Sequence, residues 1–164
     1  MSVSIRDINE ADIKQIGFWY KTVSNRFFTI DNLAILSNTE IIQKINNPYS
    51  GIKAIDLDDK IVGLLKIFLV NLEAKFLEFY ISIDEASLKS EILNEIIVSA
   101  ISDLFAKNEI DRIRTTLLDT EIQLKDSIEK MGFKHEGVLK SHVFLKSRYH
   151  DLHSLSCLRT EFNA

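Results

Sequence analysis

The segment between residues 76 and 118 constrains the fold most, because it places the clearest helix of the chain between two strand-like stretches. Its helical part has apolar residues at every third or fourth position, which are Leu88, Ile92, Leu93, Ile96, Ile97, Ala100, Ile101, Leu104 and Phe105. This 3.6-residue period predicts an amphipathic helix from Leu88 to Ala106. Phe76 to Ile83 and Arg112 to Leu118 read as strands. A strand–helix–strand unit crosses over right-handed, so these two strands should be parallel neighbours.

The remaining segments predict an α/β (α+β) arrangement. Gly51 to Leu57, Ile61 to Val70 and Phe76 to Ile83 are joined by short turns and predict an antiparallel meander. Further strands are expected at Val3 to Arg6, at about Val138 to Leu145 and at Tyr149 to Leu158. Short helices are expected after the pair Asn9 and Asp12, at Thr39 to Ile45, and after a capping box of Thr120 with Gln123 that ends at Gly132.

Composition favours one globular domain spanning residues 1–164. The chain has 46% hydrophobic residues and a formal charge of −4, and at this length one core can form without a metal or a disulfide. The single cysteine, Cys157, cannot form an internal bridge, which favours the cytoplasm. The start of the chain, Met1 to Asp7, has no apolar signal segment.

Charge and hydropathy exclude two classes of partner. The acidic pI of about 5.6 argues against nucleic acid, because binding phosphates needs a basic face. The longest apolar stretch, Ile61 to Val70, has ten residues and contains Lys66. A membrane-spanning helix needs about 20 residues, so we expect no membrane span.

The four histidines invite a metal site, because His135, His142, His150 and His153 all lie within the last 30 residues. However, His150 and His153 are three positions apart in a predicted strand and therefore point to opposite faces. No cysteine or paired carboxylate stands at ligand spacing around them. We therefore expect no metal.

The stretch from Ile128 to Leu139, with the sequence IEKMGFKHEGVL, resembles the E-K-x-G-F-x-x-E-G ending of the GNAT superfamily of N-acetyltransferases. It is most similar to the ribosomal-protein and nucleotide-amino-sugar branches. The continuation, Lys140 to Phe144 and then Tyr149-His150-Asp151, is similar to a tail of the amino-sugar enzymes. The resemblance implies a mixed sheet of about seven strands flanked by about four helices. Strands four and five should splay apart, with acetyl-CoA, or another acyl-CoA, in the gap.

The resemblance also implies roles along the fourth strand. It places Ile81, Ser82 and Ile83 beside the pantetheine arm, and a Glu at the position of Glu78 acts as catalytic base in many relatives. Tyr80 shares a face with Glu78 because the two are two residues apart. A base is needed because an amine is protonated at pH 7 and must lose a proton before it attacks a thioester. The alternative interpretation of Glu78 is a solvated or salt-bridged strand residue.

Two further groups of site residues follow from the resemblance. The family's phosphate-binding loop, R/Q-x-x-G-x-G/A, falls on residues 88–93, so Lys89, Ser90, Leu93 and Asn94 would contact the cofactor at the start of the helix. The resemblance places His142, Tyr149 and Asp151 at the border of the expected acceptor pocket; the alternative interpretation is that they are ordinary strand-end residues.

The sequence departs from the family at the cofactor site. The loop contains no glycine, although phosphates must approach bare backbone there. Glu91 adds a carboxylate that repels an anion. Where the family has N-x-x-S and a Tyr that protonates the leaving thiolate, this chain has Glu121, Leu124 and Ile128.

Two functions fit these observations. The first is an acyl-CoA-dependent N-acyltransferase acting on a primary amine of a small metabolite or amino sugar, or on a protein N-terminus. The second is a GNAT-fold binding or regulatory protein that has lost CoA binding and is catalytically inactive. A homodimer is compatible with either function.

Overall fold

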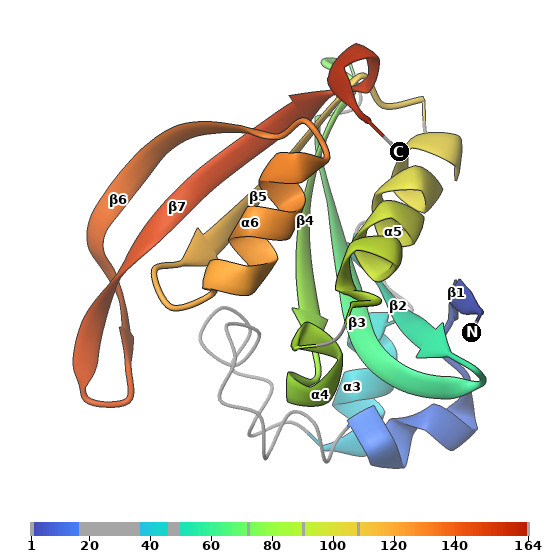
Figure 1. Ribbon diagram of the computed structural model, residues 1–164. Coiled ribbons are helices and arrows are strands. Elements are labelled where there is room, and N and C mark those ends of the chain that lie inside the picture. Colours follow the sequence, from blue (N-terminus) through green and yellow to red (C-terminus); the bar gives the residue numbers. More distant parts are fainter. Residues whose placement is uncertain are drawn as a thin grey trace.

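Seven strands form one mixed sheet in the order β1-β2-β3-β4-β5-β7-β6 (Figure 1). The computed structural model describes residues 2–16, 37–45, 50–71, 73–89, 91–107 and 109–163. The strands are β1 Val3–Asp7, β2 Ser50–Leu57, β3 Lys60–Asn71, β4 Phe76–Ile83, β5 Arg112–Leu118, β6 Lys134–Leu145 and β7 Arg148–Leu158. β4 and β5 are parallel and all other neighbours are antiparallel. The predicted meander and the predicted parallel pair are thus confirmed.

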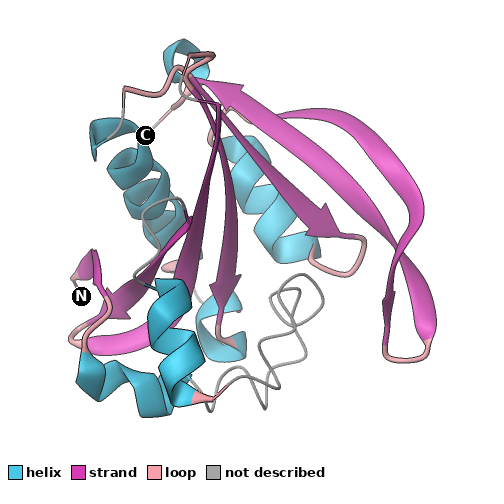
Figure 2. Ribbon diagram, turned by 180° about the vertical axis from the view of Figure 1, so that it is seen from behind, coloured by secondary structure: helices cyan, strands magenta, loops and turns pink. Residues whose placement is uncertain are grey.

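The described helices lie on both faces of this sheet. They are α3 Asn38–Ile45, α4 Glu85–Leu88, α5 Leu93–Lys107 and α6 Ile122–Lys130, with 3-10 turns at Glu10–Asp12 and Arg159–Glu161. α5 and α6 cover the face seen in Figure 1, and α3 lies on the opposite face, which Figure 2 shows from behind.

The helix expected from Leu88 to Ala106 begins five residues later than its apolar period suggested. The carboxylate of Asp84 accepts a hydrogen bond from the backbone N–H of Ser87 (2.6 Å) and caps the separate short helix α4. The chain then turns, and α5 starts at Leu93, with the first helical bond running from Ile96 N–H to the Ile92 carbonyl (3.0 Å). A strong cap immediately after β4 therefore overrides the apolar period.

The predicted start of α6 was also wrong in detail. The N-cap is Glu121 rather than Thr120, and no side chain caps the helix. The Glu121 carboxylate instead accepts the backbone N–H of Leu118 at 2.7 Å. The predicted end is confirmed, because Gly132 has a φ of +95° and donates its N–H to the Glu129 carbonyl (3.1 Å).

The core lies between the sheet and the α5–α6 layer. Alternate β4 residues Leu77, Phe79, Ile81 and Ile83 are buried, as expected for side chains that share one face of a strand. Phe79 packs edge to face against Phe133, with ring centroids 6.0 Å apart. From α5, Ile96, Ile97, Ile101 and Leu104 are fully buried. These contacts all lie on one face of β4, the face that carries α5 and α6.

β4 and β5 separate soon after they meet. Only Phe76, Leu77 and Glu78 have partners on β5, which are Arg112, Ile113 and Arg114. Beyond these pairs the two strands diverge, as Figure 1 shows. The splay that the family resemblance implied between strands four and five is therefore present.

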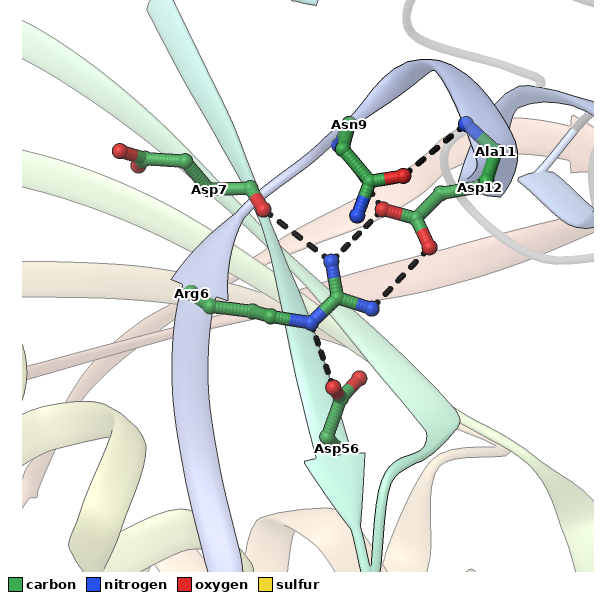
Figure 3. Close-up of polar contacts among 6 residues, drawn as sticks. All are labelled: Arg6, Asp7, Asn9, Ala11, Asp12 and Asp56. Atoms are coloured by element: carbon green, nitrogen blue, oxygen red, sulfur yellow. Dashed lines mark hydrogen bonds and ion pairs between the residues drawn. The ribbon is translucent and has the colours of Figure 1, made fainter.

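A partly buried ion cluster joins the beginning of the chain to the sheet (Figure 3). Arg6 on β1 donates from Nη1 (2.6 Å) and Nη2 (3.0 Å) to Asp12, and from Nε (2.5 Å) to Asp56 on β2. Asp12 also accepts the backbone N–H of Asn9 (2.8 Å), which completes the predicted capping pair. The hydrogen bonds from the Arg6 guanidinium lower the pKa of Asp12, so this ion pair is charged at neutral pH.

Lys66 on β3 is a buried cation, only 5% exposed, and its register partner on β4 is Tyr80. Burial disfavours the charged ammonium and lowers the pKa of Lys66 to about 8. The folded protein therefore holds this proton less firmly than the unfolded chain does.

We expect Phe79→Ala to lower the free energy of unfolding by about 3–5 kcal/mol, because it leaves a cavity against Phe133. Phe144→Ala is the matched control, since Phe144 is 60% exposed and its loss should change stability by about 0.5 kcal/mol or less. Urea unfolding followed by circular dichroism measures both. Equal effects of the two substitutions would contradict the packing described for β4.

Lys66→Met tests the buried cation. Between pH 8 and 10.5 the unfolded chain binds more protons than the folded protein at this position, so wild-type stability should rise with pH in this window. Lys66→Met should therefore stabilise the protein most at pH 7, by about 1–3 kcal/mol, and lose its advantage toward pH 10.5.

Urea unfolding at several pH values gives the difference between the two proteins. Lys60→Met, at the exposed first residue of β3, should show no such pH dependence. A pH-independent effect of Lys66→Met would rule out a shifted lysine.

Candidate active site

The splay encloses a cavity of about 350 Å³. β4 lines it with Ile81, Ser82 and Ile83, α6 contributes Leu124, and the β6–β7 hairpin contributes Arg148 and His150. This volume lies in the range of pockets that hold small ligands. The family resemblance placed the first three of these residues beside the cofactor, and the structure brings them together here.

The backbone of β4 presents polar groups to this cavity. The Asp84 N–H donates to the Val62 carbonyl of β3 (2.8 Å), and the Ser82 carbonyl approaches Gly63 of β3 so closely that a Cβ there would lie 2.7 Å from it. Backbone groups of successive strand residues point to alternate sides. Ile81 and Ile83 therefore direct their N–H and C=O groups away from β3, toward the gap.

A second cavity, of about 440 Å³, adjoins the first at the beginning of α5 and shares Leu88 and Gln123 with it. Lys89, Leu93 and Asn94, three of the predicted cofactor residues, line it, whereas Ser90 lies outside the described residues. The first backbone N–H groups of a helix have no partner within the helix and attract anions. The predicted phosphate site thus has a hollow and a helix terminus.

The charges around this second cavity are mixed. Lys89 Nζ forms an ion pair with Glu85 Oε1 (2.6 Å). Glu91 and Asp126 add negative charge to the lining. α6 supplies Lys130, which the sequence analysis missed. Its signal was the lysine of the E-K-x-G-F stretch, which ends α6 beside the start of α5.

Glu78 and Tyr80 lie at the apex of the splay. Glu78 Oε2 accepts from Arg114 Nη2 and Glu78 Oε1 accepts from the Tyr80 hydroxyl, both at 2.5 Å. Arg114 also lies over the ring of Phe76, 5.2 Å from its centroid. Among the described residues, neither Glu78 nor Tyr80 lines the 350 Å³ cavity. The catalytic roles of Glu78 and Tyr80 stay predictions. Glu78 forms a salt bridge with Arg114, as in the alternative interpretation of this residue.

The three predicted acceptor residues do not line either cavity in the described part of the chain. His142 is exposed in a β-bulge of β6. Tyr149 is 65% exposed and packs on Phe144, with ring centroids 5.1 Å apart.

Asp151 accepts hydrogen bonds from Lys140 Nζ (2.7 Å) and from the Ser141 N–H (2.8 Å). Because side chains alternate along β7, Tyr149 and Asp151 point away from the side of His150. Substrate binding by these three residues stays a prediction.

His150 is the residue of this site that the sequence analysis considered only as a metal ligand. It is 3% exposed, and its Nδ1 lies 2.7 Å from Asp119 Oδ1. Arg148 Nε donates to His150 Nε2 (3.2 Å). Because Arg148 can only donate, Nε2 must be the acceptor and Nδ1 must carry the proton. The hydrogen bond from His150 lowers the pKa of Asp119. Asp119 and His150 come together through the pairing of β5 with β7, and the sequence alone does not give the register of that pairing.

The described residues contain no group of three or more His, Cys, Asp or Glu side chains arranged to hold a metal ion. None of their helices combines the length and apolar character needed to cross a bilayer.

Comparisons with known proteins agree with this architecture. A curated relative, the SPbeta prophage-derived uncharacterized N-acetyltransferase YokL of Bacillus subtilis strain 168, is 25% identical over 109 residues. That match spans 66% of this chain and 62% of the relative.

Two solved structures share the fold. Spermidine N-acetyltransferase of Vibrio cholerae, in complex with CoA and spermine, superposes with a TM-score of 0.83 at 18% identity, over 97% of this chain and 96% of that one. The ribosomal α-N-protein acetyltransferase RimL, in complex with coenzyme A, gives a TM-score of 0.78 at 14% identity, over 96% and 94% of the two chains. Residues 5–154 match the acetyltransferase (GNAT) domain model, and the chain therefore belongs to the GNAT family.

Proposed function

We propose that the protein is an acetyl-CoA-dependent N-acetyltransferase that acts on a primary amine of a small metabolite or amino sugar, or on a protein N-terminus. The observation that carries this proposal is the splayed β4–β5 pair, with a cavity in the gap and backbone groups of Ile81 and Ile83 directed into it. The two solved relatives bind CoA, and their names give amines as their substrates.

The residues present fit acetyl-CoA in two places. Ile81, Ser82 and Ile83 would flank the pantetheine arm, because the open side of β4 can pair with the amides of that arm. The start of α5, with Lys89, Leu93 and Asn94, would hold the phosphates. Lys130 supplies a second cation there. When bound, the cofactor supplies the acyl group as a reactive thioester.

The missing glycines do not remove this phosphate site. Glycine lets a phosphate approach the backbone of a tight loop, but here the separate short helix α4 precedes α5. The resulting hollow of about 440 Å³ exposes the helix start without a glycine loop. Lys130 adds a positive charge to a lining that also contains Glu91 and Asp126, whereas Lys89 is paired with Glu85.

Other expectations stay predictions within this proposal. Glu78→Gln is the variant that tests the predicted role of Glu78 as base. In the structure both oxygens of its carboxylate are already hydrogen-bonded. The cytoplasmic location and the homodimer have no bearing on the chemistry described here. The inactive binding protein remains the alternative that the next experiment distinguishes.

Titration calorimetry with acetyl-CoA, desulfo-CoA and adenosine 3′,5′-bisphosphate tests the proposal. We expect micromolar binding that Lys130→Ala and Lys89→Ala each weaken about fivefold, the effect of about 1 kcal/mol per lost charged contact. Lys125→Ala is the matched control. Lys125 lies on the same helix, is paired with Glu129 at 2.9 Å and does not line the second cavity.

Two outcomes of the titration would contradict parts of this proposal. If neither heat nor a thermal shift is seen at millimolar acetyl-CoA, the enzyme proposal is wrong and the chain is a GNAT-fold binding protein. If CoA binds but the lysine variants bind equally well, the phosphates lie elsewhere.

A further inference from the structure

The cavity in the splay needs a group that can accept a proton, if the proposed function is correct. The acceptor is a primary amine, which is protonated at pH 7 and cannot attack until it has lost a proton. The ionisable residues that line the cavity in the described part of the chain are Glu121, Lys146, Arg148 and His150. The two cations have no lone pair to offer at pH 7, and the Glu121 carboxylate accepts the Leu118 N–H.

The surroundings of His150 are those of an oriented base. Asp119 accepts a hydrogen bond from the Nδ1–H group of His150. This bond fixes the orientation of the ring and leaves the lone pair on Nε2. The carboxylate would also stabilise the imidazolium that forms when Nε2 takes up a proton. Burial keeps the ring in one orientation beside the gap where Ile81 and Ile83 present their backbone.

We propose that His150, oriented by Asp119, is the general base that accepts the proton of the acceptor amine in this cavity. The inference rests on the proposed function. The ammonium proton passes to His150 Nε2, and the freed nitrogen lone pair attacks the thioester carbon. The new C–N bond forms, the C–S bond breaks, and the electron pair leaves with the CoA thiolate. The imidazolium then returns its proton to this thiolate, and the second amine proton passes to solvent.

Arg148 must leave Nε2 before the amine can reach it. Its bond is 3.2 Å long and Arg148 itself is exposed at the start of β7, so exchange for a substrate amine costs little. The charged groups that contact His150 are Asp119, at Nδ1, and Arg148, at Nε2. Glu121 and Lys146 lie elsewhere on the cavity wall.

Glu78 is less suited to this step. Its two oxygens are held by Arg114 and Tyr80 at 2.5 Å, and the described lining of the cavity does not include it.

His150→Asn is the decisive variant, because the asparagine amide can still donate to Asp119 from near the position of Nδ1. We expect kcat/KM for an alkyl primary amine to fall about 10²- to 10⁴-fold, with the dissociation constant of acetyl-CoA unchanged. His153→Asn is the matched control. His153 bonds to His135 (3.0 Å), outside the cavity, and its loss should leave the rate unchanged.

Two readouts separate a base from a structural role. Hydroxylamine or a hydrazide is largely unprotonated at pH 7, so His150→Asn should slow its acetylation far less than that of an alkyl amine. The wild-type pH profile of kcat/KM should show an acidic limb between pH 5 and 8, where histidines change charge, and His150→Asn should lack it. Glu78→Gln, assayed alongside, should keep this limb.

NMR of the wild-type protein tests the geometry without any substrate, since neutral His150 should carry its proton on Nδ1. An Nε2–H tautomer would overturn the assignment. An active wild type with an equally active His150→Asn variant, folded by circular dichroism, would overturn the role of His150 but leave the acetyltransferase intact. A wild type that binds no acetyl-CoA and acetylates no amine would overturn the proposed function, and this inference with it.

Discussion

The end of hydrogen bonding between β4 and β5 after Glu78 and Arg114 is the constraint on which the site depends. A central strand normally has both edges paired, because unpaired backbone groups are costly when buried. Here the core on one face, centred on Phe79 and α5, holds β4 in place although one edge is open. The Arg114–Glu78 ion pair joins the two strands at the last paired position. Beyond this position no described strand pairs with this edge of β4, and this is the edge that we propose pairs with an amide-containing ligand.

The sequence predicted those parts of the fold that depend on local periodicity. The apolar period of α5 and the alternation of β4 led to the parallel β4–β5 pair, because few topologies accommodate a strand, a long helix and a strand. The start of α5 could not be predicted from the same period. Residues 88–92 continue the apolar pattern, but the cap at Asp84 begins a separate helix before them.

The site was less accessible to sequence reasoning because its residues meet only through sheet register. Ile81, Ser82, Ile83, Lys89, Leu93 and Asn94 were placed by the family motif, and they do surround the two cavities. Tyr149 and Asp151 were predicted to border the acceptor pocket, but their side chains alternate with that of His150 and lie on the other side of β7. Asp119 and His150 are 31 residues apart, and no spacing rule joins them. The pair forms because the Asp119 N–H bonds to the Asp151 carbonyl (3.1 Å), where β5 passes β7.

The close approach of Gly63 to the Ser82 carbonyl links the gap to a strand that does not line it. Any side chain at position 63 would meet backbone atoms of β4, which cannot rotate aside as a flexible side chain would. β4 would have to move away from β3, toward the open edge, and the gap would narrow. The width available to a ligand is thus set by the absence of a methyl group on the neighbouring strand. A substitution at position 63 would therefore alter the space between β4 and β5 without any change in the wall of the cavity.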